Sequence, residues 1–249
     1  MFNEDKSIRI SSYKKNEDFI KSSRLTTQKA MRNGFSYNFD WLGFKIIQFP
    51  EDIQNLQQII FNEKPSCIIE TGLAHGGSAI LAASILNLVH LTSSKDNALV
   101  PKVHCIELEV LQKTKEAIEK HFFSKMINIY QGSSINKNIY KALLSNLREG
   151  ENPLVILDSC HTTEHVLGEL MLYSRLTPSG GSLIVCDTSV GIVGPAFDNC
   201  KYGVSFQNNP LLAVESFLKT EEGKDFYLND EINDGLLLSS NFSGYLKRK

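Results

Sequence analysis

The sequence predicts an α/β fold with a doubly wound, mostly parallel sheet and an antiparallel pair of C-terminal strands. Helical patterns at 77–91, 110–123, 136–148 and 162–175 separate five short apolar runs: CIIET (67–71), VHCIELE (103–109), INIYQGS (127–133), PLVILDS (153–159) and SLIVCDT (182–188). Strands that alternate with helices form crossover units and lie parallel in one sheet. Unbroken apolar runs are typical of strands covered on both faces. Together these observations indicate a Rossmann-like architecture.

The segments before the first core strand are less regular. Residues 1–40 are polar and weakly patterned, although 22–33 could form a helix that ends at Gly34. We expect an N-terminal arm or lid over the domain, with a frayed tail as an equal alternative. The run WLGFKIIQFPEDI (41–53) predicts an extended piece, followed by a helix from Glu51 or Asp52 to about residue 62. Residues 41–249 are expected to form one domain.

The C-terminal part completes the predicted sheet. PLLAVESFLK (210–219) has the spacing of an amphipathic helix. FYLND (226–230) and GLLLSSNFSGYLK (235–247) are predicted as two strands joined by a short turn. An antiparallel strand pair at one edge is a common variant of the doubly wound sheet.

Composition narrows the class of protein. The 249 residues are 42% hydrophobic and 22% charged, which is typical of a globular domain. A net charge of −2 gives no basic bias, so we expect no nucleic-acid partner. The five cysteines form no C-x-x-C pair, which indicates a reducing, cytoplasmic compartment. The polar N-terminus is no signal peptide, and no apolar run suggests a membrane span.

A glycine-rich turn, IIETGLAHGGSAIL (68–81), follows the first core strand and opens a helix near Gly77. Glycines let the backbone approach a ligand, and a helix N-terminus offers free N–H groups. The spacing G-x-x-x-G-G is neither the dinucleotide fingerprint nor a Walker A loop. The turn therefore suits a ligand with a charged amino-acid end. Tight packing by Gly76 and Gly77 is the structural alternative, and His75 would serve the turn or the rim of the ligand site.

Two further positions follow the second and third strands. Glu107 could accept hydrogen bonds from two ribose hydroxyls, although it lies further from the turn than is usual in nucleotide folds. Glu109 competes for this role, and a solvated strand end is the alternative for both. The QGSS sequence (131–134), with Ser133, could border an adenine ring.

The sharpest motif is LDSCHTTEHVLGEL (157–170), in which Asp158 ends a strand and His161 follows three residues later. Asp187 ends the next strand, and the ends of neighbouring parallel strands converge at one edge. Two close carboxylates repel unless a cation lies between them, and Mg²⁺ prefers oxygen ligands. We therefore expect Asp158 and Asp187 to hold a metal and His161 to act as a general base. A helix cap at Asp158 and a hydrogen-bonded core imidazole at His161 are the alternatives.

At this point the chain resembles the cephalosporin hydroxylase-type family, whose members have the class I methyltransferase fold and whose relatives include metal-dependent sugar O-methyltransferases. The resemblance runs from about Trp41 to the C-terminus and rests on WLGFKIIQFPEDI, IIETGLAHGGSA, VILDSCHTTEHVLGELMLYSRL, GGSLIVCDT, NPLLAVESFLK and GYLKRK. It implies S-adenosylmethionine as cofactor, with binding residues Glu70, Gly72, Ala74, His75, Gly76, Gly77, Ser78, Glu107, Ser133 and Asp158.

The resemblance also implies chemistry. An Asp-x-x-His pattern in metal-dependent relatives supplies a metal ligand and a general base, and Asp158 and His161 match it. Those relatives often carry a Glu-Asp pair where this chain has Cys186-Asp187, so one carboxylate for Mg²⁺ is missing. The expected activity is methyl transfer to a hydroxyl of a sugar or small metabolite. Residues 1–40 and 190–209 would cover the site, and the arm suggests subunit exchange in a homo-oligomer.

Two other functions stay open from the sequence. One is a metal-dependent hydroxylase of a small metabolite, because the family name refers to hydroxylation. The sequence shows no H-x-D pattern of a two-histidine, one-carboxylate iron site, which argues against it. The other is a catalytically silent protein that binds the adenosyl group.

Overall fold

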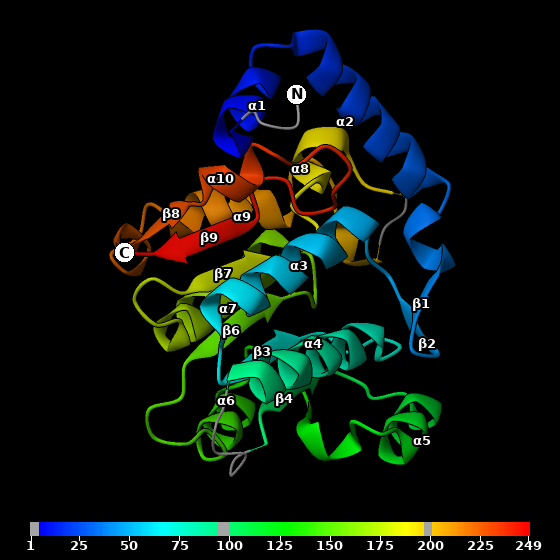
Figure 1. The fold of residues 1–249 in the computed structure, drawn as a ribbon, viewed down its shortest axis with the longest axis vertical. Helices are drawn as coiled ribbons and strands as arrows, with labels where there is room; N and C mark the ends of the chain where they lie inside the picture. The colour runs from blue at the N-terminus through cyan, green and yellow to red at the C-terminus, as the bar shows by residue number, and fades with distance from the viewer. Residues whose placement is uncertain (1–4, 94–99, 197–200) are drawn as a thin grey trace.

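A seven-stranded sheet forms the centre of the molecule in the computed structural model, which describes residues 5–93, 100–196 and 201–249 (Figure 1). The strand order is β5-β4-β3-β6-β7-β9-β8. Strands β5, β4, β3, β6 and β7 run parallel, whereas β9 lies antiparallel to both of its neighbours. The chain enters the sheet at β3 in its middle and adds β4 and β5 on one side. It then returns to add β6 and β7 on the other side of β3. The predicted doubly wound α/β fold is confirmed.

The five predicted parallel strands all form, and most are shorter than predicted at their carboxyl ends. Their bounds are β3 Cys67–Thr71, β4 Lys102–Glu107, β5 Ile127–Gln131, β6 Pro153–Leu157 and β7 Ser182–Val185. The first residue after each of β5, β6 and β7 still donates to the neighbouring strand, and the chain then leaves the ladder in a bend or turn. These turns carry the polar residues singled out from the sequence.

Helices cover both faces of the sheet, as the apolar strands require. One face packs against α3 Pro50–Glu63, α4 Gly77–Ser93 and α5 Gln112–Lys120. The other face packs against α6 Lys137–Leu144, α7 Thr163–Tyr173 and α9 Pro210–Phe217. Helix α4 is buried along most of its length because it lies between the sheet and α3, which explains its uniformly small and apolar sequence.

The N-terminal part forms two helices, α1 Lys6–Tyr13 and α2 Glu17–Arg32, and a hairpin of β1 Phe39–Trp41 and β2 Phe44–Ile46. Helix α2 starts earlier than predicted and ends just before Gly34, which has a φ of 65°. The helix packs on α8 Val190–Val193, and Gln28 donates a hydrogen bond to the carbonyl oxygen of Val193. The role of residues 1–40 as an arm or lid stays a prediction.

The C-terminal strands differ from the sequence prediction in their connection. β8 Phe226–Leu228 and β9 Tyr245–Arg248 do form, but no short turn joins them. Helix α10 Asp230–Asn233 and a loop over 234–244 lie between them. The N-terminal end of α3 holds this loop, because Glu51 accepts from the N–H of Leu237 and Asp52 accepts from the N–H of Ser240 at 2.9 Å. The predicted strand over 235–247 was therefore too long, since its apolar residues pack as a loop.

Candidate active site

The glycine-rich turn joins β3 to α4 at the carboxyl edge of the sheet, and its backbone geometry requires glycine at two positions. Gly72 has a φ of 91°, and a side chain there would begin 2.0 Å from the carbonyl oxygen of Asp158. A side chain at Gly77 would begin 2.2 Å from the carbonyl oxygen of Lys45. The turn is therefore pressed between the β6 end and the β2 strand. Ala74 also adopts a positive φ of 43°, and Gly76 one of 84°.

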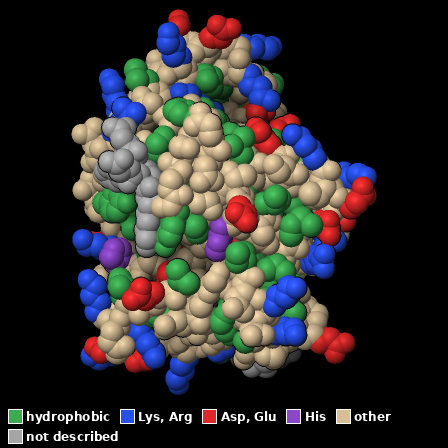
Figure 2. Space-filling model, turned by 180° about the vertical axis from the view of Figure 1, so that it is seen from behind, with side chains coloured by type: hydrophobic (Ala, Val, Ile, Leu, Met, Phe, Trp, Pro, Cys, Tyr) green, Lys and Arg blue, Asp and Glu red, His purple; other side chains and the backbone are tan. Residues whose placement is uncertain are grey.

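An open cleft of about 330 Å³ lies on this turn. Its lining includes Gly72, Ala74, His75, Gly77, Ser78 and Asp158, all predicted from the sequence to bind a cofactor. Lys45, Ile47 and Gln48 line the other wall. Figure 2 shows the molecule from behind, where histidine side chains border a hollow in the surface. The structure thus brings together most of the turn residues and the end of β6.

Two predicted acids lie beneath and beside the turn. Glu70 is 1% exposed, and burial raises its pKa to about 8 despite a hydrogen bond from Ser78. It supports the turn from below and does not line the cleft. Glu107 accepts from the N–H groups of Leu73 at 2.9 Å and Ala74 at 3.1 Å through Oε2. The Glu107 carboxylate therefore already fixes the turn. That Glu70 and Glu107 bind the cofactor stays a prediction.

Asp158, His161 and Asp187 converge at the ends of β6 and β7. One ligand atom of each lies within 4.8 Å of the others. The Nε2 of His161 is 3.2 Å from Oδ2 of Asp187, and both side chains are about one-third exposed. Asp187 adopts a φ of 56°, a left-handed conformation in which aspartate is among the more tolerated residues. The parallel pairing of β6 with β7 brings these residues together, as the sequence predicted, and their roles stay predictions.

The electrostatics of this group favour a bound proton or cation. Burial and the neighbouring carboxylate of Asp187 raise the pKa of Asp158 to about 7, although His161 opposes the shift. Two carboxylates this close cannot both ionise without cost unless a positive charge compensates them. Cys186, which takes the place of the second expected carboxylate, is 5% exposed and lies in the apolar core.

A buried polar chain supports the loop that carries Asp158 and His161. Ser159 donates to Glu169 at 2.6 Å, and the Nε2 of His165 lies 3.6 Å from the same Glu169 oxygen. His165 also hydrogen-bonds the hydroxyl of Ser134 at 2.8 Å. His165 therefore connects the turn after β5 to the turn after β6. Ser133, predicted near an adenine ring, lies half-buried in the first of these turns, and its role stays a prediction.

The start of α7 is capped from a distant segment. Thr162 precedes the helix, but its side chain makes no capping hydrogen bond. Instead Asn208 accepts from the N–H of Thr163 at 2.9 Å, and Thr163 donates to the carbonyl oxygen of Asn209. The end of the 190–209 segment is thereby fixed next to the site. Residues 197–200 of this predicted cover lie outside the described residues.

Sequence reasoning missed the wall formed by the β2 region. Lys45, Ile47 and Gln48 line the cleft because the hairpin folds back over the first turn of α4. The run WLGFKIIQFPEDI (41–53) was part of the family resemblance, but it was predicted only as an extended piece. A single lysine in an extended segment is too common to indicate a site.

Comparison with known proteins now identifies the group to which these features belong. Residues 33–249 match the family described as Rhamnosyl O-methyltransferase/CmcI. The chain belongs to this family. The resemblance drawn from the sequence motifs is thereby confirmed, and the Rhamnosyl O-methyltransferase/CmcI match covers the cleft, the Asp158 loop and the C-terminal strands.

Curated relatives of this Rhamnosyl O-methyltransferase/CmcI member are distant. The Rhamnosyl O-methyltransferase of Mycobacterium leprae is 26% identical over 150 residues, which is 60% of this chain and 60% of the relative. The same-named protein of Mycobacterium tuberculosis H37Rv is 27% identical over 160 residues, or 60% and 57% of the two chains. The chain thus matches about three-fifths of the length of these relatives.

Solved structures share the fold. The cmcI structure with Mg and SAM has a TM-score of 0.54 at 17% identity, covering 86% of this chain and 77% of that chain. An O-methyltransferase from Bacillus cereus in complex with SAH has a TM-score of 0.52 at 14% identity, covering 83% and 81%. Among the described residues, no helix is both long and apolar enough to span a lipid bilayer.

Proposed function

We propose that this chain is an S-adenosylmethionine-dependent O-methyltransferase that acts on a hydroxyl of a sugar or another small metabolite. The observation that carries the proposal is the convergence of Asp158, His161 and Asp187, since Asp158 also lines the glycine-rich cleft. The names of the relatives agree, since they are Rhamnosyl O-methyltransferases. A cytoplasmic location and a homo-oligomeric state stay predictions.

The cleft has groups suited to each part of the cofactor. The free N–H groups at the start of α4 and the ammonium group of Lys45 can donate hydrogen bonds to the carboxylate of the methionine end. Glu107 accepts from the turn through Oε2, and Oε1, which accepts from the N–H of Glu109 at 3.3 Å, has a further lone pair for a ribose hydroxyl. Ser133, in the turn after β5, would border the adenine ring. The cofactor-binding residues inferred from the sequence therefore share one edge of the sheet.

The residues present fit Mg²⁺, because the ligand atoms of Asp158, His161 and Asp187 lie within 4.8 Å of one another. Asp158 and Asp187 would supply its carboxylate oxygens, and the positive charge would offset the repulsion between these two acids. With Cys186 in place of a second acid, water and substrate oxygens would have to fill more positions. When bound, Mg²⁺ would lower the pKa of a coordinated hydroxyl.

The protein's own groups perform the remaining steps. The cleft orients the acceptor hydroxyl in line with the methyl–sulfur bond, and orientation of this kind supplies up to about 7 to 11 kcal/mol. His161 takes the hydroxyl proton as the oxygen attacks the methyl carbon. The carboxylate of Asp187 beside Nε2 stabilises the imidazolium that forms. The methyl group moves to oxygen, and its bonding electron pair stays on sulfur.

The test is transfer of labelled methyl from S-adenosylmethionine to a panel of deoxysugar glycosides and small phenols, with and without Mg²⁺. We expect His161→Asn to lower kcat by about 10²- to 10⁴-fold while leaving cofactor affinity unchanged. His90→Asn is the matched control, because His90 lies at the far end of α4 from the cleft. Cofactor binding without any transfer, or oxygen consumption in place of transfer, would contradict the proposal.

A further inference from the structure

A second cluster of metal-ligating side chains lies at the opposite end of the sheet from the cleft. Cys67 is the first residue of β3, His104 is near the start of β4, and Glu151 comes just before β6. Cys67 pairs with Lys102, so His104, two residues further on, points to the same face of the sheet. The Cys67 sulfur, a His104 nitrogen and a Glu151 oxygen all lie within 4.8 Å of one another.

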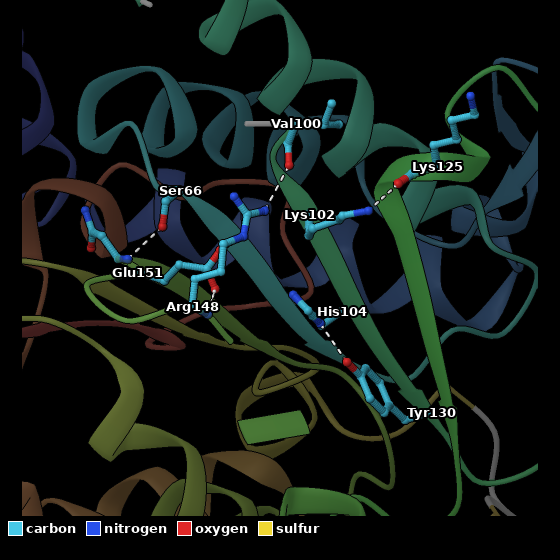
Figure 3. A network of polar contacts seen from close by, with 9 residues as sticks. Ser66, Val100, Lys102, His104, Lys125, Tyr130, Arg148 and Glu151 are labelled. Atoms are coloured by element: carbon cyan, nitrogen blue, oxygen red, sulfur yellow. Dashed lines mark hydrogen bonds and ion pairs between the residues drawn. The ribbon is translucent and has the colours of Figure 1, made fainter. Parts of the chain in front are cut away.

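His104 has one satisfied and one unsatisfied nitrogen. Its side chain is 1% exposed, and Nδ1 lies 2.9 Å from the hydroxyl of Tyr130, as Figure 3 shows. Within the described part of the chain, Nε2 has no hydrogen-bond partner. A buried polar atom without a partner costs about 1 to 3 kcal/mol, so such atoms are rare unless something else binds them. If Nδ1 carries the proton and donates it to Tyr130, Nε2 presents a free lone pair.

Cys67 and Glu151 bring a thiol and a carboxylate to the same place. Cys67 is fully buried, and burial together with the charge of Glu151 raises the pKa of its thiol to about 12. The Glu151 side chain is only 8% exposed. A divalent cation between them would stabilise the thiolate and the carboxylate together, since a coordinating thiol loses its proton.

We propose that Cys67, His104 and Glu151 form a zinc site, separate from the methyl-transfer centre. Zinc takes sulfur, imidazole nitrogen and carboxylate oxygen in tetrahedral sites, with bonds of about 2.0 to 2.3 Å. Binding therefore draws the three ligand atoms closer than they lie here. Water would complete the fourth position. Mg²⁺ is a poor competitor, because it prefers oxygen ligands and geometry that a thiolate does not offer.

The surroundings are consistent with such a site. The Tyr130 hydroxyl stands behind His104 as the outer partner that metal-binding histidines usually have. The Nε of Arg148 lies 3.3 Å from Oε1 of Glu151, and the backbone N–H of Arg148 donates to Oε2 of Glu151 at 3.0 Å (Figure 3). The ion would connect β3, β4 and the segment before β6, and would stabilise this end of the sheet.

The test uses the full chain after removal of metals with a chelator. Zinc chloride alone is titrated in calorimetry, and cobalt chloride is used as a spectroscopic probe. We expect one high-affinity zinc per chain, a higher melting temperature, and thiolate-to-cobalt charge-transfer absorption that is absent in Cys67→Ser. Cys105→Ser is the matched control, because Cys105 is an equally buried cysteine whose sulfur faces Glu70 instead.

A milder variant keeps the test decisive if Cys67→Ser does not fold. Tyr130→Phe removes only the hydroxyl behind His104, and we expect a loss of about 10- to 100-fold in zinc affinity. His161→Asn, in the methyl-transfer centre, should bind zinc at this site as the wild type does. Absence of charge-transfer absorption in the wild type would overturn the proposal, as would its persistence in Cys67→Ser. Neither result would affect the proposed methyl transfer.

Discussion

The substitution Gly72→Ala tests the cleft geometry most directly. Gly72 has a φ of 91°, and a methyl group would begin 2.0 Å from the carbonyl oxygen of Asp158, where contacts under 3.0 Å force a shift. The ends of β3 and β6 must therefore part by at least about 1 Å, by subtraction of these distances. Left-handed backbone costs alanine about 1 to 2 kcal/mol. Overpacking of a well-packed site adds about 1 to 3 kcal/mol.

We therefore expect Gly72→Ala to lower the free energy of unfolding by about 2 to 5 kcal/mol in urea denaturation. The displacement moves Asp158 relative to the cleft, and a shift of about 1 Å can cost about 10²-fold in rate. Gly180→Ala is the matched control, because Gly180 has a φ of 73° but no atom within 4 Å of the added methyl. This control measures the cost of the left-handed backbone without the steric clash. Equal losses of stability in the two variants would refute the steric argument.

Three further predictions concern the cofactor and the N-terminal end of α3. Glu107→Gln should weaken S-adenosylmethionine binding in calorimetry by about 10- to 100-fold, since hydrogen bonds to charged groups contribute about 1.5 to 3 kcal/mol; unchanged affinity would mean that ribose binds elsewhere. Lys45→Met should weaken the same binding by no more than about 5-fold, because exposed ion pairs contribute about 1 kcal/mol or less, and a larger loss would show a buried contact. Asp52 is 2% exposed, and burial raises its pKa from 3.8 to about 6. Its contribution to stability is thus complete below pH 3.8 and lost as the pH rises through about 6. In urea denaturation, the unfolding free energy of the wild type relative to Asp52→Asn should fall by about 3 kcal/mol over this range; a constant difference would exclude Asp52 as the titrating group.

The order of the central elements could be predicted from the sequence because each strand is a short apolar run. The predicted carboxyl ends of most of these strands were too long by two or three residues. The polar residues after them were counted as strand, but they lie in bends and turns, and Asp158 among them lines the cleft. The hairpin over 39–46 was predicted only as an extended piece, since a strand of three residues has too little pattern to be recognised. Most of the loop over 234–244 was taken for a strand, because its apolar residues follow the Asp-Gly turn signal at 234–235.

The candidate site was likewise predicted in part from the sequence. Asp158 and His161 lie three residues apart, so their proximity followed from the chain, and Asp187 was expected near them from the parallel sheet. The ion pair between His161 and Asp187 depends on side-chain placement. Lys45 reaches the cleft only because Gly77 lets the β2 backbone approach α4.

The sequence by itself determined the α/β class, the strand ends that carry polar groups, and the family, because these depend on periodicity and on motifs of neighbouring residues. Only the tertiary structure decided that Cys67, His104 and Glu151 meet, since 37 and 47 residues separate them along the chain. The lateral order of strands sets which distant residues become neighbours. That order is fixed by packing of the whole sheet against its helices, which no local pattern encodes.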